Sequence, residues 1–147
     1  KAGPAELGPP GGVYLVGYRG GEPVCGGGLK RLPDGACEIK RMYVAPQARR
    51  SGVARALLAA LEGAARDLGY RIARLDTGDR QPHAQAFYEA SGYRAVGNFN
   101  NNPAAAFHGE KQLDYAPSSP ASLSNWVRSW PRTTSATPRG SPFAVRW

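Results

Sequence analysis

The stretch from Tyr43 to Leu61 constrains the fold of this chain of 147 residues more than any other. It reads as the end of an apolar strand, a turn containing Pro46, a loop of small and basic residues, and an amphipathic helix that starts near Gly52. The first turn of a helix has unpaired N–H groups and partial positive charge. Three arginines add full charges beside it: Arg49, Arg50 and Arg55. We therefore expect an anion site, suited to phosphate, at this helix start.

Hydrophobic periodicity and turn residues predict an α/β domain with a mixed sheet. The expected strands are 13–18, 23–31, 36–44, 71–75, 93–96 and 105–113, and the expected helices are 52–68 and 82–91. The glycines at 26–28 indicate a β-bulge or a close approach of backbones. A turn at Asp34-Gly35 should place Cys37 opposite Leu32, well apart from Cys25. Two such cysteines are expected to remain free thiols in a reducing cytoplasm.

Composition narrows the classes of function. The net charge of +8 permits nucleic-acid binding, but the basic side chains of the main body are interspersed with acidic ones, so no nucleic-acid partner is expected. No apolar run approaches the roughly 18 residues that cross a bilayer, so no membrane partner is expected either. No His, Cys or Asp cluster has the spacing of a metal site. A cytoplasmic protein without a bound metal is the resulting expectation.

Three motifs carry a family resemblance. Arg49-x-x-Gly52-x-Ala54, after a strand and before a helix, resembles the acetyl-CoA pyrophosphate loop of the GNAT N-acetyltransferase superfamily. The segment 84–93, Ala-x-x-Phe-Tyr-Glu-x-x-Gly-Tyr, is similar to the superfamily's second signature, and the Asn-rich run 98–113 resembles the end of small bacterial members. The resemblance covers residues 13–113. It implies the GNAT acyl-CoA N-acyltransferase fold, a mixed, mostly antiparallel sheet flanked by helices.

The same resemblance implies an enzyme that moves an acetyl group from acetyl-CoA, its co-substrate, to a primary amine of a small molecule or peptide. The amine would attack the thioester directly in a ternary complex. The residues implied to bind acetyl-CoA lie on the third strand, in the loop before the helix, and at the second helix: Met42, Tyr43, Val44, Arg49, Arg50, Ser51, Gly52, Val53, Ala54, Arg55, Gln81 and Ala84. Gln81 stands where many relatives have Asn.

Two residues are the catalytic candidates. Tyr88 matches the tyrosine of the second signature, whose hydroxyl points at the CoA sulfur in many relatives. The resemblance makes Tyr88 the candidate that protonates the departing thiolate; the alternative is a structural tyrosine packed beneath the helix. Glu38 lies at the spacing from Gly52 that histone-type relatives show for their general base, and we expect it to share a strand face with Met42. The alternative for Glu38 is a surface carboxylate paired with a neighbouring cation. His83 and His108 are weaker candidates for proton transfer.

The ends of the chain depart from the family pattern. Residues 1–12 read as a loop where relatives have a strand and helices, so the domain is expected to be shortened at its N-terminus. Residues 114–147 form a Ser-, Pro- and Arg-rich tail with the three tryptophans, Trp126, Trp130 and Trp147. The tail is either a disordered or appended segment, or an arm that covers this domain or a second subunit, as in a homodimer. A CoA-binding module of GNAT fold without catalytic turnover is the alternative function.

Overall fold

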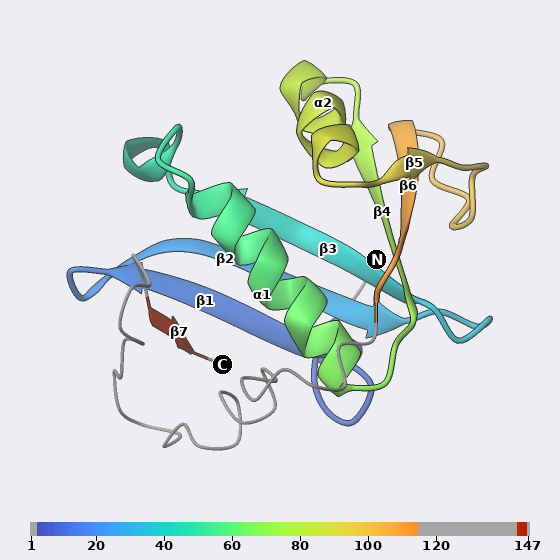
Figure 1. Ribbon diagram of the computed structural model, residues 1–147, viewed down its shortest axis with the longest axis horizontal. Coiled ribbons are helices and arrows are strands. Elements are labelled where there is room, and N and C mark those ends of the chain that lie inside the picture. Colours follow the sequence, from blue (N-terminus) through green and yellow to red (C-terminus); the bar gives the residue numbers. More distant parts are fainter. Residues whose placement is uncertain (1–2, 115–143, 147) are drawn as a thin grey trace.

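Three antiparallel strands form one half of the sheet, and glycine-containing turns join them. They are β1 (Val13–Arg19), β2 (Glu22–Arg31) and β3 (Cys37–Val44). Gly20, Gly21 and Gly35 in the two turns have φ values between 58° and 90°, a region that glycine enters without steric cost. The computed structural model describes residues 3–114 and the backbone of residues 144–146 (Figure 1).

The strands of the other half of the sheet come after the long helix α1 (Val53–Asp67) in the sequence. It contains β4 (Ile72–Gly78), β5 (Arg94–Ala95) and β6 (Ala105–Gln112), with the short helix α2 (Pro82–Ala90) between β4 and β5. The strand order is β5-β6-β4-β3-β2-β1-β7, and among the described strands only β3 and β4 run parallel. The strand β7 (Ala144–Arg146) pairs antiparallel with residues 16–18 of β1.

Helix α1 crosses one face of the sheet over β2 and β3 (Figure 1). Its core-facing side is apolar at helical spacing, and the buried members are Val53, Leu57, Leu58, Leu61, Ala64 and Ala65. Each buried leucine contributes about 1.5–3 kcal/mol to the free energy of unfolding. Gly69, with a φ of 90°, ends the helix as a left-handed residue. This packing fixes the start of α1 relative to the end of β3.

The predicted fold class and the order of elements are confirmed, with local corrections. Cys37 lies opposite Arg31, not Leu32, because the hairpin closes with a bond from the Leu32 N–H to the Ala36 carbonyl. Both cysteines are buried and free. The strand expected at 71–75 runs on to Gly78, and the strand expected at 93–96 shortens to two residues. The predicted tail interactions, including those of the tryptophans, lie outside the described residues.

Candidate functional site

The site begins where β3 and β4 separate. The two strands pair only at Cys37–Ala73 and Glu38–Arg74, and beyond these pairs they diverge toward their carboxyl ends (Figure 1). A cavity of about 580 Å³ occupies the opening, and it is lined by residues 39–42, 75–81, 88 and 104. Open α/β sheets bind ligands at the carboxyl ends of their parallel strands. The opening is therefore the natural place for a substrate.

A β-bulge in β3 decides which side chains face this cavity. Arg41 and Met42 both lie opposite one residue of β2, Gly27, and Arg41 accommodates the extra residue with a φ of 56°. Met42 lies on the α1 face, because a Cβ on Gly27 would meet both Met42 and Leu61 of α1. Glu38 precedes the bulge and lies on the opposite face. The expectation that Glu38 and Met42 share a strand face is therefore wrong.

The same register places Glu38 and Lys40 on the face of the sheet away from α1, here called the far face. Leu29, two residues along β2 from Gly27, shares the α1 face, and Ile39 pairs with Leu29. Neighbouring residues of a strand point to opposite faces, so the residues on either side of Ile39 belong to the far face. Glu38 is only 1% exposed there.

The loop between β3 and α1 leaves the helix start open. Arg50 and Gly52 have φ values of 60° and 80°, and they turn the chain into the helix. The Ser51 hydroxyl donates a hydrogen bond to the Ala48 carbonyl, which fixes the loop. In the part of the chain that the structure describes, no side chain caps α1, and a Cβ on Gly52 would meet no atom within 4 Å. The N–H groups of the first turn therefore face free space that an anion could fill.

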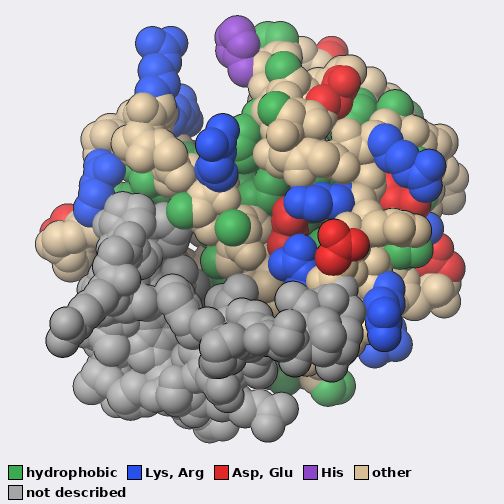
Figure 2. Space-filling view, viewed as in Figure 1, with side chains coloured by type: hydrophobic (Ala, Val, Ile, Leu, Met, Phe, Trp, Pro, Cys, Tyr) green, Lys and Arg blue, Asp and Glu red, His purple; other side chains and the backbone are tan. Residues whose placement is uncertain are grey.

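Positive charge surrounds this helix start. Arg49, Arg50 and Arg55 are exposed, and Arg49 Nε donates to the Val44 carbonyl at 3.2 Å. A fourth arginine arrives from β1, since Arg19 Nη1 lies 3.3 Å from the Ser51 hydroxyl. Figure 2 shows Lys and Arg side chains around this corner of the molecule, at its upper left. The combination of N–H groups and guanidinium groups favours a phosphate ligand.

Tyr88 lies on the α2 side of the cavity. Its hydroxyl donates to Met42 Sδ at 3.4 Å, and its ring packs edge-on against Phe87 and Tyr93. Burial is the main cause that raises the pKa of Tyr88 to about 12, and the charge of Asp76 raises it further. Tyr88 is therefore neutral near pH 7, and its hydroxyl can act as a proton donor.

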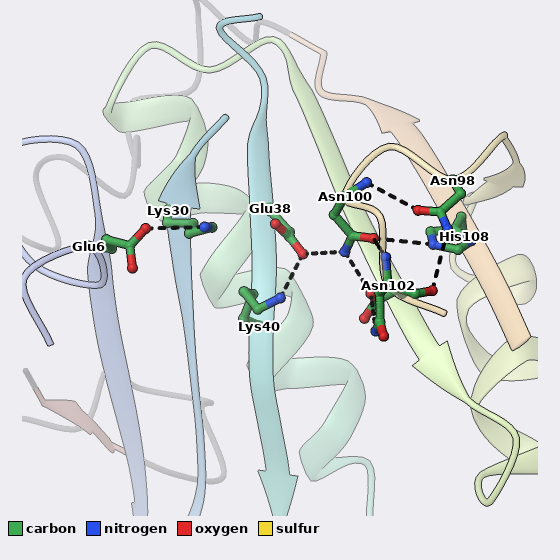
Figure 3. A network of polar contacts seen from close by, with 9 residues as sticks. Glu6, Lys30, Glu38, Lys40, Asn98, Asn100, Asn102 and His108 are labelled. Atoms are coloured by element: carbon green, nitrogen blue, oxygen red, sulfur yellow. Dashed lines mark hydrogen bonds and ion pairs between the residues drawn. The ribbon is translucent and has the colours of Figure 1, made fainter. Parts of the chain in front are cut away.

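A polar network occupies the far face beside the cavity (Figure 3). Glu38 Oε1 accepts hydrogen bonds from Lys40 Nζ at 2.8 Å and from Asn100 Nδ2 at 2.9 Å. The same Nδ2 of Asn100 donates to Asp76 Oδ2 at 2.6 Å, and Asn102 Nδ2 donates to that oxygen at 2.9 Å. One side-chain amide thus links two carboxylates, an arrangement here called the amide bridge. Asp76 lines the cavity, whereas Glu38 does not.

The structure brings the expected residues together in part. Met42, Gln81 and Tyr88 line one cavity, and the residues 49–55 surround the start of α1 at the same end of the sheet. Tyr43 is 56% exposed. The side chain of Val53 belongs to the core, so only its backbone can serve a ligand. Their roles in binding remain predictions.

Sequence reasoning missed two residues of the site, Asp76 and Asn100. Asp76 fell outside because the strand was expected to end at Leu75, although the alternation of apolar and polar residues continues through 76 and 77. Asn100 was seen only as part of an Asn-rich run. His108, a weak candidate, joins the network through Asn100, whereas His83 lies exposed on α2.

The described residues contain no group of three or more His, Cys, Asp or Glu side chains that could hold a metal ion. Across the same residues, neither helix is long and apolar enough to cross a membrane.

The chain is similar in sequence to known acetyltransferases. Residues 4–93 match the family model of the acetyltransferase (GNAT) family. An IAA acetyltransferase of Azospirillum brasilense is 37% identical over 87 residues, which cover 58% of this chain and 57% of that protein. The chain spans about half the length of the curated relatives that it matches.

Solved structures show the same architecture. A Klebsiella pneumoniae protein assigned to the acyl-CoA N-acyltransferases superimposes with a TM-score of 0.67 at 34% identity, over 76% of this chain and 79% of that chain. A GNAT family acetyltransferase from Elizabethkingia anophelis, with acetyl-CoA bound, superimposes with a TM-score of 0.62 at 19% identity, over 70% and 77% of the two chains.

Proposed function

Because the chain belongs to the acetyltransferase (GNAT) family, we propose that it transfers the acetyl group of acetyl-CoA to a primary amine of a small molecule or peptide. One observation carries the proposal. The cavity between the diverging strands has a tyrosine on one side and a carboxylate on the other, Tyr88 and Asp76, and the arginine-rich start of α1 lies at the same end of the sheet. A proton donor, a proton acceptor and a phosphate site are the parts that acyl transfer from a CoA thioester needs.

In this proposal, the N–H groups of residues 50–55 hold the pyrophosphate of acetyl-CoA, and Arg49, Arg50 and Arg55 neutralise its charge. The pantetheine arm extends along residues 42–44 of β3. Among the described residues, the β4-side edge of β3 has no partner strand beyond Glu38. Gln81 and Ala84 border the arm from α2. An extended ligand can bond to the free edge of a strand through main-chain groups, and Met42 lies beside the Tyr88 hydroxyl.

The reaction is a direct attack of the neutral amine on the thioester carbonyl carbon. A C–N bond forms and the C–S bond breaks, and the electron pair of the C–S bond leaves on sulfur. Before the attack, a carboxylate takes a proton from the incoming ammonium, and it later releases this proton to solvent. Tyr88 donates its proton to the thiolate, and the proton that the new amide nitrogen loses returns to the tyrosinate through water. One positioned acid or base contributes about 10²- to 10⁴-fold to the rate.

The carboxylate that receives the amine proton belongs to the amide bridge. Glu38 was the candidate from the sequence, but Lys40 and Asn100 already bond its Oε1. Asp76 lines the cavity and lies close enough to Tyr88 to influence its pKa. We assign the direct contact with the amine to Asp76, and a supporting electrostatic role to Glu38.

The alternative function, a CoA-binding module without turnover, rests on those contacts of Glu38, which resemble a structural ion pair. One experiment separates the two. The full chain is incubated with acetyl-CoA and a panel of amines, namely an amino acid, a polyamine, an arylalkylamine and a short peptide, and release of free thiol is followed with a thiol reagent. Amine-dependent thiol release supports transfer. Micromolar CoA binding by calorimetry without such release for any amine supports the binding module instead.

A further inference from the structure

Asn100 occupies the centre of the polar network. Its Nδ2 bonds to Glu38 and Asp76, and its Oδ1 lies 3.3 Å from His108 Nε2. All three partners come from different strands, β3, β4 and β6 (Figure 3). A single side chain thus joins the two strands that separate to form the cavity.

The three contacts determine the orientation of the amide. An ionised carboxylate can only accept hydrogen bonds, so the NH₂ group must face Glu38 and Asp76, and the carbonyl oxygen must face His108. His108 Nε2 therefore carries a proton and donates it to Asn100 Oδ1. Each of the two protons of the amide group has its own carboxylate acceptor, so rotation of the amide would place an oxygen against two negative charges.

The loop that carries Asn100 is built to hold it. Asn98 Oδ1 accepts the N–H of Asn100 at 3.3 Å, and Asn100 Oδ1 accepts the N–H of Asn102 at 3.2 Å. Asn102 Oδ1 accepts the N–H of Ala104 at 3.1 Å. These bonds span two residues each, as in Asx turns, which asparagine forms readily. Asn101 between them has a φ of 55°, a region that asparagine tolerates better than most residues.

We propose that Asn100 is a positioning residue of the amine side of the site, which holds the Asp76 carboxylate toward the cavity by tying it to Glu38. The inference rests on the proposed acetyl transfer. Without the bridge, two carboxylates that share one amide group would repel each other, and the Asp76 side chain would leave the position in which it meets the amine. Other charged or titratable groups face the pair from the neighbouring elements: Lys40 bonds to Glu38, Arg74 on β4 pairs with Glu38 in the sheet, His108 on β6 pairs with Asp76, and Tyr88 on α2 lies near Asp76.

The test compares three substitutions in the full chain. Asn100→Asp keeps the shape of the side chain and replaces both donors by acceptors, and Asn100→Ala removes the bridge. Asn101→Gly is the matched control, because Asn101 is exposed and glycine adopts its positive φ without strain. Both Asn100 variants should lower kcat by roughly 10- to 100-fold, the range found for residues that orient a functional group. The KM for acetyl-CoA and the rate of Asn101→Gly should stay within about threefold of wild type.

A spectroscopic readout is independent of turnover. In wild type, the ¹⁵N shifts of His108 should report a protonated Nε2, and both amide protons of Asn100 should exchange slowly with solvent. Asn100→Ala removes the acceptor for His108 Nε2, so the His108 signal should change in this variant and stay unchanged in Asn101→Gly. If either Asn100 variant fails to fold, Asn102→Ala, which removes one of the two amide bonds to Asp76, replaces it with the same expected direction.

The outcomes separate the two claims. If the folded Asn100 variants have the same kcat as wild type, the positioning role is overturned and the proposed function stays intact. Fast-exchanging Asn100 amide protons in wild type overturn the bridge itself. A wild-type chain that binds CoA and acetylates no amine overturns the proposed function, and the positioning role with it.

Discussion

Tyr88→Phe removes one hydroxyl and retains the ring contacts with Phe87 and Tyr93. Among the described residues, the hydroxyl bonds to a thioether alone, Met42 Sδ at 3.4 Å, which is a weak acceptor. Its loss should therefore change the free energy of unfolding near pH 7 by less than about 1 kcal/mol. Turnover should fall by roughly 10- to 1,000-fold, which corresponds to about 1.4–4 kcal/mol of activation free energy. Calorimetry should show CoA affinity within a few-fold of wild type.

Alkaline unfolding tests the environment of the same hydroxyl without any substrate. The pKa of Tyr88 is raised from 10.0 to about 12 in the folded state, so the unfolded chain loses this proton first as pH rises. Tyr88 contributes stability that is present below pH 10 and is lost between pH 10 and pH 12, by about 1.4 kcal/mol per pH unit. Urea unfolding at a series of pH values from 10 to 12 gives the free energy of unfolding at each pH. Its decrease with rising pH, here called the alkaline slope, should be shallower in Tyr88→Phe than in wild type. Burial also raises the pKa of Tyr93, so a slope should persist in the variant.

Tyr14→Phe is the matched control, since Tyr14 lies on β1 and is 37% exposed. It should preserve turnover. Unchanged turnover of Tyr88→Phe at every pH would show that Tyr88 is structural and that another group protonates the thiolate. An unchanged alkaline slope would refute the assignment of a raised pKa to its burial.

Three further predictions concern the cofactor loop, the carboxylates and the tail. Gly52→Val should weaken CoA binding at least tenfold by calorimetry, because the valine side chain fills the open space at the helix start and is strained at a φ of 80°. An unchanged CoA affinity would contradict the assignment of the phosphate site to this helix start. Asp76→Asn should lower kcat/KM for the amine more than Glu38→Gln does. Both losses should become smaller above the pKa of the amine, because the amine is then already neutral and needs no base. A larger loss in Glu38→Gln would show that Glu38 is the base. Ending the chain after Leu113 removes β7 and uncovers the edge of β1, so light scattering should show more self-association. A fragment that stays monomeric and equally heat-stable would contradict a covering role for the tail.

The parts of the site that could be predicted from sequence are local ones. The arginine-rich loop and the start of α1 follow from strand, loop and helix signals within about ten residues, and local chain chemistry determines their geometry. Tyr88 was found through a motif on one helix. Asp76 and Asn100 meet Glu38 only because β3, β4 and the loop before β6 converge. Asn100 lies 24 positions along the chain from Asp76 and 62 positions from Glu38. Such contacts have no local signal.

The bulge at Arg41 shows where an alternation argument fails. The glycines at 26–28 did indicate an irregularity, but the extra residue belongs to the facing strand β3. Because side chains alternate with a period of two, one extra residue moves every later side chain to the other face. Glu38 and Lys40, which precede the bulge, therefore lie on the far face, and Met42, which follows it, lies on the α1 face. A sequence pattern cannot tell which strand of a pair carries the bulge.

The bulge in β3 separates the two catalytic candidates onto different faces of the sheet. Tyr88 approaches the cavity from the α1 face, where its hydroxyl meets Met42, whereas Glu38 and the amide bridge lie on the far face. The group that protonates the thiolate and the groups that receive the amine proton are thus separated by the opening between β3 and β4. The two proton transfers need no direct contact between acid and base. Each can have its own environment: a buried one that keeps Tyr88 protonated, and a hydrogen-bonded one around the carboxylates. A regular β3 would have placed Glu38 and Met42 on one face, and the bulge is what keeps the two environments apart.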